Sequence, residues 1–265
     1  WARATICSIK LKDGRVGRLE QFLVFPSSDP PIFPSSIMKY ILTDIEGTTT
    51  DIDFVHQVLF PYAYEKLPAY VRLHEREPEV AEIISEVQQT MLTEKEQIAD
   101  VEAAIQQLLN WIQEDRKHPA LKRLQGMIWQ EGYETGGFRG HVYPDVVPQI
   151  EAWRAQGIGI GIYSSGSVAA QKLLFGYSTE GDLNHLFDHN FDTGVGHKKE
   201  ANSYRNIAKE IGLSPEEILF LSDVEAELDA AEAAGMQTTQ LVRPGIEPTK
   251  KHPTAKDFTE IDMKI

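Results

Sequence analysis

The stretch Tyr40-Ile41-Leu42-Thr43-Asp44-Ile45-Glu46-Gly47-Thr48-Thr49-Thr50 decides the fold. Its first four residues are apolar or β-favouring and predict a buried strand. The strand leads directly into Asp44, a second acid follows at Glu46, and the glycine and threonines after it predict a turn rich in hydroxyl and amide groups. Because ligands of open parallel sheets bind beyond the carboxyl ends of the strands, both acids are expected at a binding edge. Taken alone, however, the stretch fits a strand end with a capping aspartate equally well.

The composition is that of an ordinary globular protein. A length of 265 residues allows one large domain or two small ones, and 42% of the residues are hydrophobic and 25% charged. The net charge of −14 disfavours nucleic acid and anionic membranes as partners. No apolar run approaches the roughly 20 residues that span a bilayer. Cys7 is the only cysteine, so no internal disulfide can form, and we expect a cytoplasmic protein, or also a nuclear one in a eukaryote.

Residues 1–37 differ from the rest of the chain. They carry five basic residues against three acids and a stretch rich in proline and serine, which does not favour regular structure. Met38 directly precedes the first strand. We expect Met38 to be the natural start and residues 1–37 to be a disordered or non-native leader. A short hairpin built from Thr5–Lys12 and Arg18–Phe25 is the alternative.

A helical segment follows the first strand, from about residue 53 to residue 140. Apolar residues recur at helical spacing in several groups, which predicts a small bundle. The first group is expected to be broken by Pro61 and Pro68. The later groups are Val80, Ile83, Ile84, Val87 and Met91 after Pro78; Ile98, Val101, Ile105, Leu108, Leu109 and Ile112; and Leu121, Leu124, Ile128 and Trp129. We expect this segment to be an all-helical insertion.

From Gly140 onward, predicted strands and helices alternate. Strands are expected near Ile158–Tyr163, Leu186–Phe191, Ile218–Leu221 and Thr238–Val242, with helices between them. Such alternation predicts an α/β fold with a parallel sheet and right-handed crossovers. The expected division is therefore a core domain of residues 38–52 and 141–265, with a helical domain of residues 53–140 inserted in it.

Polar residues stand at the ends of four predicted strands, or in the loop that follows the strand. In a parallel sheet the carboxyl ends of the strands meet at one edge, so these residues are expected to lie together. Each has an ordinary structural explanation, since serines can cap helices and a lysine is usually solvated. Their occurrence together, in this order, favours a reactive site. The residues are Asp44 and Glu46, Ser164 and Ser165 with Gly166, Lys198, and Asp223.

In this order, these residues resemble motifs I to IV of the haloacid dehalogenase-like (HAD) phosphohydrolases. Glu46 departs from the usual second aspartate of motif I, and this departure resembles the enolase-phosphatase E1 family. Further segments are similar to that family, namely Phe54-Val55-His56, Leu59-Phe60-Pro61-Tyr62-Ala63, Gly140-His141-Val142-Tyr143-Pro144-Asp145-Val146, Tyr163-Ser164-Ser165-Gly166-Ser167, Gly196-His197-Lys198, Leu221-Ser222-Asp223 and Arg243-Pro244-Gly245. The resemblance implies a HAD-like Rossmannoid sheet whose helical insertion serves as a cap domain.

The chemistry of phosphate esters explains the residue types. Asp44 is the expected nucleophile that forms an aspartyl-phosphate, and Glu46 is the expected general acid and base. Mg²⁺ is expected on Asp44, Asp223 and the backbone carbonyl of Glu46. Lys198 offsets anionic charge and contacts substrate, as do Ser164, Ser165 and Gly166 at a helix start. Glu227, four residues after Asp223, is a candidate to orient Lys198 or a metal-bound water.

The resemblance implies a small phosphorylated metabolite as substrate, 2,3-diketo-5-methylthiopentyl-1-phosphate of methionine salvage, which is first enolised and then dephosphorylated to an acireductone. The base for enolisation stays open between Glu46 and cap residues such as His56. A HAD phosphatase that acts on another small phosphate ester is the alternative. A dehalogenase, or a phosphate-accepting binding protein without turnover, is disfavoured by the set of acids and the long insertion. We expect a monomer.

Overall fold

The computed structural model describes residues 9–10, 16–17, 38–96, 98–261 and 263. Contacts divide the chain into residues 1–35 and residues 36–265. In the first unit, strands β1 (Ile9–Lys10) and β2 (Val16–Gly17) pair in antiparallel fashion, Ile9 with Gly17 and Lys10 with Val16. The rest of the expected leader, and with it most of the alternative hairpin, lies outside the described residues.

The second unit is built on a six-stranded sheet in which every pairing is parallel. The strand order is β5-β4-β3-β6-β7-β8. This confirms the predicted α/β fold with a parallel sheet. The strands are β3 (Tyr40–Thr43), β4 (Gly159–Tyr163), β5 (His189–Phe191), β6 (Ile218–Ser222), β7 (Gln237–Leu241) and β8 (Thr254–Ala255). β8 was not predicted, because a strand of two residues is too short to show an alternating pattern.

Helices cover both faces of the sheet. Since successive side chains of a strand point to opposite faces, Ile41 packs into one core cluster and its neighbours Tyr40 and Leu42 into another. The first cluster contains α6 (Val146–Ala155) and α7 (Val168–Gly176), and the second contains α8 (Ala201–Ile211) and α9 (Glu225–Ala233). Short 3₁₀ turns lie at Asn184–Leu186, Thr193–Val195, Pro215–Glu217 and Phe258–Glu260. The sheet is thus the middle of three layers.

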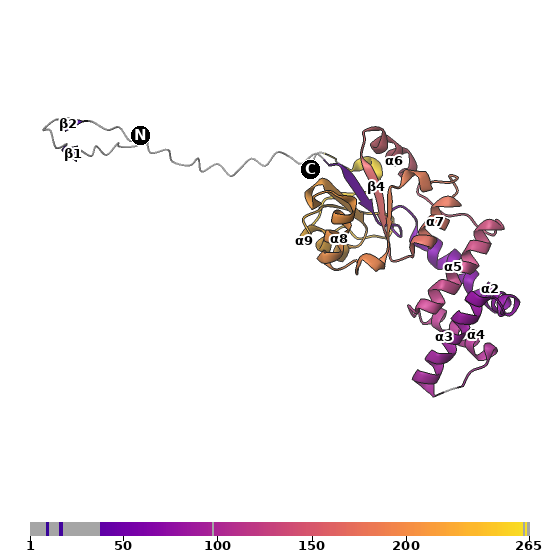
Figure 1. The fold of residues 1–265 in the computed structure, drawn as a ribbon. Coiled ribbons are helices and arrows are strands. Elements are labelled where there is room, and N and C mark those ends of the chain that lie inside the picture. The colour runs from indigo at the N-terminus through magenta and orange to yellow at the C-terminus, as the bar shows by residue number, and fades with distance from the viewer. Residues whose placement is uncertain (1–8, 11–15, 18–37, 97, 262, 264–265) are drawn as a thin grey trace. The chain divides into compact units, whose positions relative to one another are not determined.

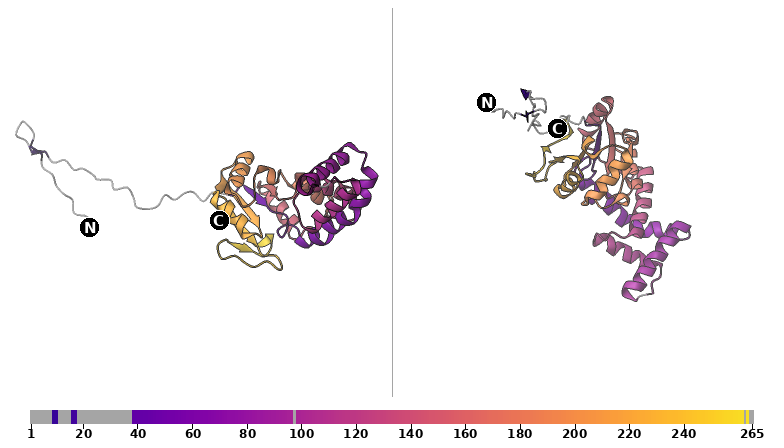
Figure 2. Two further views of the ribbon diagram at one scale, coloured as in Figure 1. Left: turned by 90° about the horizontal axis from the view of Figure 1, so that it is seen from below. Right: turned by 60° about the vertical axis from the view of Figure 1, so that its left-hand side comes forward.

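Most of the chain between β3 and α6 is helical, and its helices form a group of their own, coloured indigo to magenta (Figure 1). The same group stays together in the two turned views (Figure 2). It buries a separate core that includes Leu67, Val87, Leu108, Trp111 and Leu124. No helix among the described residues is long and apolar enough to cross a membrane. The elements are α1 (Ile52–Phe54), a π-helical turn (Val55–Leu59), α2 (Phe60–His74), α3 (Pro78–Lys95), α4 (Val101–Gln113) and α5 (Pro119–Glu134).

Two expectations for this segment were wrong. Pro61 and Pro68 do not break the first helix, because Pro61 lies in the first turn of α2, where an N–H is dispensable, and Pro68 lies inside it. An internal proline costs about 3 kcal/mol, and the full burial of Leu67 and Val71 on the inner face of α2 offsets that cost. Ile98 does not join the apolar face of α4, which begins at Val101, and its side chain is 91% exposed.

Candidate active site

The register of the sheet brings the polar strand ends together. Thr43 on β3 pairs with Ile162 on β4 and with Leu221 on β6, so Asp44 lies one step beyond both pairings. Ser164 and Asp223 directly follow the ends of the two neighbouring strands. The chain runs from β3 to β5 in one direction across the sheet and from β6 to β8 in the other. Asp44 therefore stands at the point where the strand order reverses, which is where open α/β sheets bind ligands.

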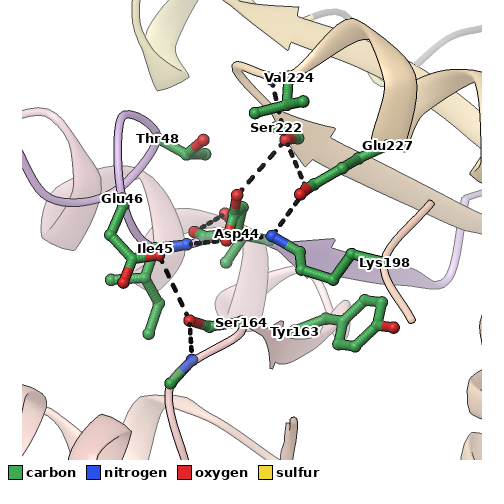
Figure 3. Close-up of polar contacts among 12 residues, drawn as sticks. Asp44, Ile45, Glu46, Thr48, Tyr163, Ser164, Lys198, Ser222, Val224 and Glu227 are labelled. Carbon is green, nitrogen blue, oxygen red and sulfur yellow. Dashed lines mark hydrogen bonds and ion pairs between the residues drawn. The ribbon is translucent and has the colours of Figure 1, made fainter. Parts of the chain in front are cut away.

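Asp44 and Lys198 form the buried centre of the site (Figure 3). The Nζ atom of Lys198 lies 2.7 Å from Oδ1 of Asp44 and 2.7 Å from Oε2 of Glu227. The backbone N–H of Ile45 also donates to Oδ1 of Asp44 at 2.7 Å. Burial opposes the charge of Lys198, but the two carboxylates outweigh it and raise its pKa. Lys198 is thus a fixed positive charge beside Asp44.

The loop before α8 positions Lys198 by its backbone. The hydroxyl of Tyr204 donates to the Lys198 carbonyl at 2.7 Å. Gly196 has a φ of +138°, and a Cβ there would lie 2.2 Å from Oγ of Ser203, so only glycine fits this close approach. The next residue, Lys199, is exposed. Of the two adjacent lysines, only Lys198 enters the site.

Glu46 and Ser164 face each other across the ends of β3 and β4 (Figure 3). The Ser164 hydroxyl donates to Oε2 of Glu46 at 3.4 Å, and it accepts the N–H of Gly166 at 3.1 Å. Burial and the charge of Asp44 raise the pKa of Glu46. A raised pKa favours the protonated form of the carboxyl group, which suits a general acid.

Asp223 has an unused oxygen at the centre of this acidic group. Its buried Oδ1 makes no hydrogen bond to any described residue. Burial, and next the charge of Asp44, raises the pKa of Asp223 to about 6. Gly47, with a φ of +70°, lets the motif I turn approach closely, since a Cβ there would lie 2.4 Å from Oδ2 of Asp223. An unpaired buried carboxylate oxygen amid excess negative charge is the environment that a cation relieves.

The donor set fits a hard divalent cation. Burial, followed by the charge of Asp44, also raises the pKa of Glu227, so several acids here crowd one another. Across the described residues, no three His, Cys, Asp or Glu side chains are grouped as a metal site. A cation at this edge would therefore use the carboxylates of Asp44 and Asp223 together with backbone oxygen and water, a combination typical of Mg²⁺.

Sequence reasoning missed several polar residues that support the site. The Ser222 hydroxyl donates to Oε2 of Glu227 at 3.1 Å and contacts Oδ2 of Asp44 at 3.5 Å. The Thr48 hydroxyl accepts the N–H of Asp223 at 3.1 Å. Arg243 is only 5% exposed and donates twice to the Thr48 carbonyl. The sequence offered little to identify them. Ser222 and Thr48 stand beside residues of the resembled motifs, and Arg243 lies in the family-like segment Arg243-Pro244-Gly245.

Other expected site residues lie less centrally. Ser165 is exposed, and its carbonyl accepts the Nζ of Lys122, from α5, at 3.5 Å. Gly166 is half-buried and points its N–H toward Ser164 rather than into open space. His56 lies exposed on the π-helical turn, with its ring edge-on to Phe60. The structure thus groups Asp44, Glu46, Ser164 and Lys198 closely, with Asp223 beside them.

Comparisons with known proteins agree with this arrangement. The family model described as haloacid dehalogenase-like hydrolase matches residues 38–235. A protein named enolase-phosphatase E1 from Serratia proteamaculans is 52% identical over 227 residues, which are 86% of this chain and 98% of that protein. A second, from Klebsiella pneumoniae, is 53% identical over 225 residues, or 85% and 97% of the two chains. The crystal structure of the UTR4 protein from Saccharomyces cerevisiae is 39% identical, with a TM-score of 0.72 over 84% of this chain and all of that one.

The family match covers well over half of the chain, and the named relatives are matched over nearly their whole length. HAD hydrolases generally use a divalent metal, which accords with the unpaired oxygen of Asp223. The chain belongs to the haloacid dehalogenase-like hydrolases and, within them, to the enolase-phosphatase E1 family.

Proposed function

We propose that this chain is the enolase-phosphatase of methionine salvage. It enolises 2,3-diketo-5-methylthiopentyl-1-phosphate and then hydrolyses the phosphate to give the acireductone. The identity to proteins named enolase-phosphatase E1 supports the substrate. The observation that carries the chemistry is the 2.7 Å contact of Lys198 with Asp44, next to the unpaired Oδ1 of Asp223.

In the phosphatase step, the carboxylate of Asp44 attacks phosphorus and forms an aspartyl-phosphate. The bond from phosphorus to the ester oxygen breaks, and that oxygen takes the proton of Glu46. Water then attacks the aspartyl-phosphate and gives its proton to Glu46, so inorganic phosphate leaves and both acids return to their first state. Lys198, already seated against Asp44, holds the negative charge of the phosphoryl group during both transfers.

We propose Mg²⁺ as the cofactor, held by the carboxylates of Asp44 and Asp223 and the backbone carbonyl of Glu46. When bound, it neutralises phosphate oxygens and the acids around it, which lets the anionic nucleophile and the anionic ester approach. Ser164, Ser165 and Gly166, just before α7, are the proposed contacts for the remaining phosphate oxygens, with the N–H of Gly166 exchanging its bond to the Ser164 hydroxyl for one to phosphate.

Enolisation requires a base that removes a proton from the carbon between the carbonyl and the phosphate ester. Glu46 is the economical choice: ionised at the start, it takes this proton and gives it to the leaving oxygen in the next step, while the enolate oxygen takes a proton from solvent and the proton that Glu46 later gains from water returns to solvent. Its contact with Ser164 places it at the edge where the phosphate is expected. Cap residues such as His56 stay the alternative.

The domain division belongs to the same proposal. Residues 53–140 serve as the cap, residues 38–52 and 141–265 as the catalytic core, and residues 1–37 as a leader outside both. Helices α2 to α5 bury an apolar core of their own, from Ala63 to Ile128, which supports a separate cap. We propose a monomer in the cytoplasm that acts on a small phosphorylated metabolite.

A panel of phosphate esters that includes the diketo substrate tests this function. Phosphate release and ultraviolet absorbance are recorded together, with and without a chelator, and with vanadate as inhibitor. We expect the diketo ester to be hydrolysed fastest, with absorbance of the enol product and loss of both signals in chelator. Faster turnover of another ester, without the absorbance change, would favour the alternative HAD phosphatase.

A further inference from the structure

Arg243, just beyond β7, makes an unusually complete set of contacts for a residue outside the proposed chemistry. Its Nε and Nη2 donate to the Thr48 carbonyl at 3.1 and 2.9 Å. Its Nη1 and Nη2 donate to the two carboxylate oxygens of Asp145 at 2.9 and 2.8 Å. The Cζ atom of its guanidinium group lies over the ring of Tyr143, 4.1 Å from the ring centroid. A buried guanidinium held on every side is a rigid support and not a solvated charge.

The support acts on the turn that carries the motif I acids. Thr48 receives Arg243 on its carbonyl and, through its hydroxyl, accepts the N–H of Asp223 at 3.1 Å. Tyr143, which stacks on Arg243, also donates its own N–H to the carbonyl of Thr49 at 3.0 Å. The turn is therefore fixed on one side by Arg243 and Tyr143, and on the other by Asp223.

The same end of β7 reaches Asp223 by a second route. The side-chain amide of Gln240, which is 2% exposed, donates to the carbonyl of Asp223 at 2.9 Å. The N–H and the carbonyl of Asp223 are thus held by Thr48 and by Gln240. Two residues of one segment, Gln240 and Arg243, together define where the carboxylate of Asp223 stands relative to the backbone of Glu46.

We infer that Arg243 is a positioning residue for cation binding: through Thr48 it sets the spacing between the motif I turn and Asp223. This inference rests on the proposed function, because it assumes that a divalent cation binds between these two segments. Groups that orient the ligands of a metal without touching it typically change metal affinity by about 10–100-fold when they are replaced. We expect an effect of that size here.

Calorimetric titration of chelator-treated protein with Mg²⁺ tests the inference without turnover. Arg243→Lys keeps the charge opposite Asp145 but loses the fork that holds Thr48, so its Mg²⁺ dissociation constant is expected to rise about 10–100-fold. Thr48→Val keeps the side-chain shape, loses the acceptor for the N–H of Asp223, and is expected to weaken Mg²⁺ in the same direction. In both variants, phosphate release should recover when Mg²⁺ is raised to saturation.

Arg154→Lys is the matched control. Arg154 also donates to a backbone carbonyl, that of Leu186, and to both oxygens of a carboxylate, Asp188, at 3.0–3.1 Å. Its partner Asp188 directly precedes β5, the outermost strand on the side of the sheet away from β7 and β8. We expect this variant to bind Mg²⁺ as the unmodified chain does.

The outcomes separate the inference from the proposed function. An unmodified chain that binds no Mg²⁺ refutes both. If it binds Mg²⁺, an unchanged dissociation constant in Arg243→Lys, or a change no larger than in Arg154→Lys, overturns the inference alone. If Arg243→Lys does not fold by circular dichroism, Thr48→Val decides, and an unchanged dissociation constant in that variant overturns the inference.

Discussion

Replacing Lys198 by methionine removes the ammonium group and keeps a flexible stem of similar length. The side chain is 7% exposed and its Nζ atom contacts two carboxylates at 2.7 Å, Asp44 and Glu227. Losing a positioned charge that stabilises a transition state typically lowers kcat by about 10²–10³, or 2.7–4 kcal/mol. We expect Lys198→Met to lose at least that much phosphate release, because Lys198 also holds the nucleophile Asp44 in place.

The same change has a calculable effect on stability. Removing one partner from a buried charge pair destabilises a protein by about 3–5 kcal/mol, because the remaining charge is left without compensation. Here Glu227 has a pKa raised to about 7 even with Lys198 present. It can therefore take up a proton when the ammonium is lost, and near pH 7 we expect a loss at the lower end of that range. The loss should grow as pH rises further, since Glu227 must then ionise without the ammonium group that offsets its charge.

Lys199→Met provides the control for both measurements. Lys199 is adjacent in sequence, carries the same charge and is exposed. We expect urea unfolding within about 0.5 kcal/mol of the unmodified chain and nearly unchanged phosphate release, as is usual for surface substitutions. Wild-type turnover in Lys198→Met, or greater loss in Lys199→Met, would refute the assignment of Lys198 to the site.

Three further predictions follow from the site and the chain. Asp44→Asn should abolish phosphate release, because an amide cannot attack phosphorus. Spectroscopic detection of the phosphorylated enol in this variant would show that enolisation has a separate base. Substantial phosphate release, with the substitution confirmed by mass spectrometry, would exclude the aspartyl-phosphate. Mg²⁺ affinity should fall by up to about tenfold per pH unit below pH 6, because the pKa of Asp223 is raised to about 6 and binding must then displace its proton. Calorimetry in buffers of different ionisation enthalpy should show that proton release. An affinity that does not depend on pH would contradict the prediction. Deleting residues 1–37 should leave the melting temperature and turnover nearly unchanged, because the family match begins at residue 38 and the six-stranded sheet is built from residues 40–255; a large drop in either would show that the leader supports the body.

The sequence predicted the sheet well because its strands carry strong local signals. Ile218–Ser222 is a continuous apolar run buried at every position, and its strand and the residues after it were both expected. The motif I acids were also expected at the sheet edge, because a strand end fixes where the next residue lies. Prediction failed where no local pattern exists, as in β8, whose two residues pair with Gln240 and Leu241 of β7.

The helical segment shows the opposite error, in which local rules were too strong. Pro68 predicts a helix break, yet α2 continues through it because its inner face is completely buried. The contacts of Arg243 could not be predicted for another reason. Arg243 and Thr48 are separated by 195 residues in the sequence. No local pattern in either segment predicts that the carbonyl of Thr48 accepts two hydrogen bonds from the guanidinium group of Arg243. Such contacts are a property of the assembled sheet edge.

Two acids of the site also bear on the stability of the chain. Asp223 and Glu227 have raised pKa values, to about 6 and about 7, so each is destabilising in its ionised form. Their ordinary values lie lower, so between about pH 4 and pH 7 these two acids keep protons in the folded chain that they lose in the unfolded chain, and the stability that they contribute falls as pH rises. A bound cation reverses that trend, because it favours the ionised acids and binds only the folded chain. At a concentration one hundred times its dissociation constant, it would add about 2.7 kcal/mol. We therefore expect the proposed cation to stabilise the folded chain through the same acids that serve the proposed chemistry.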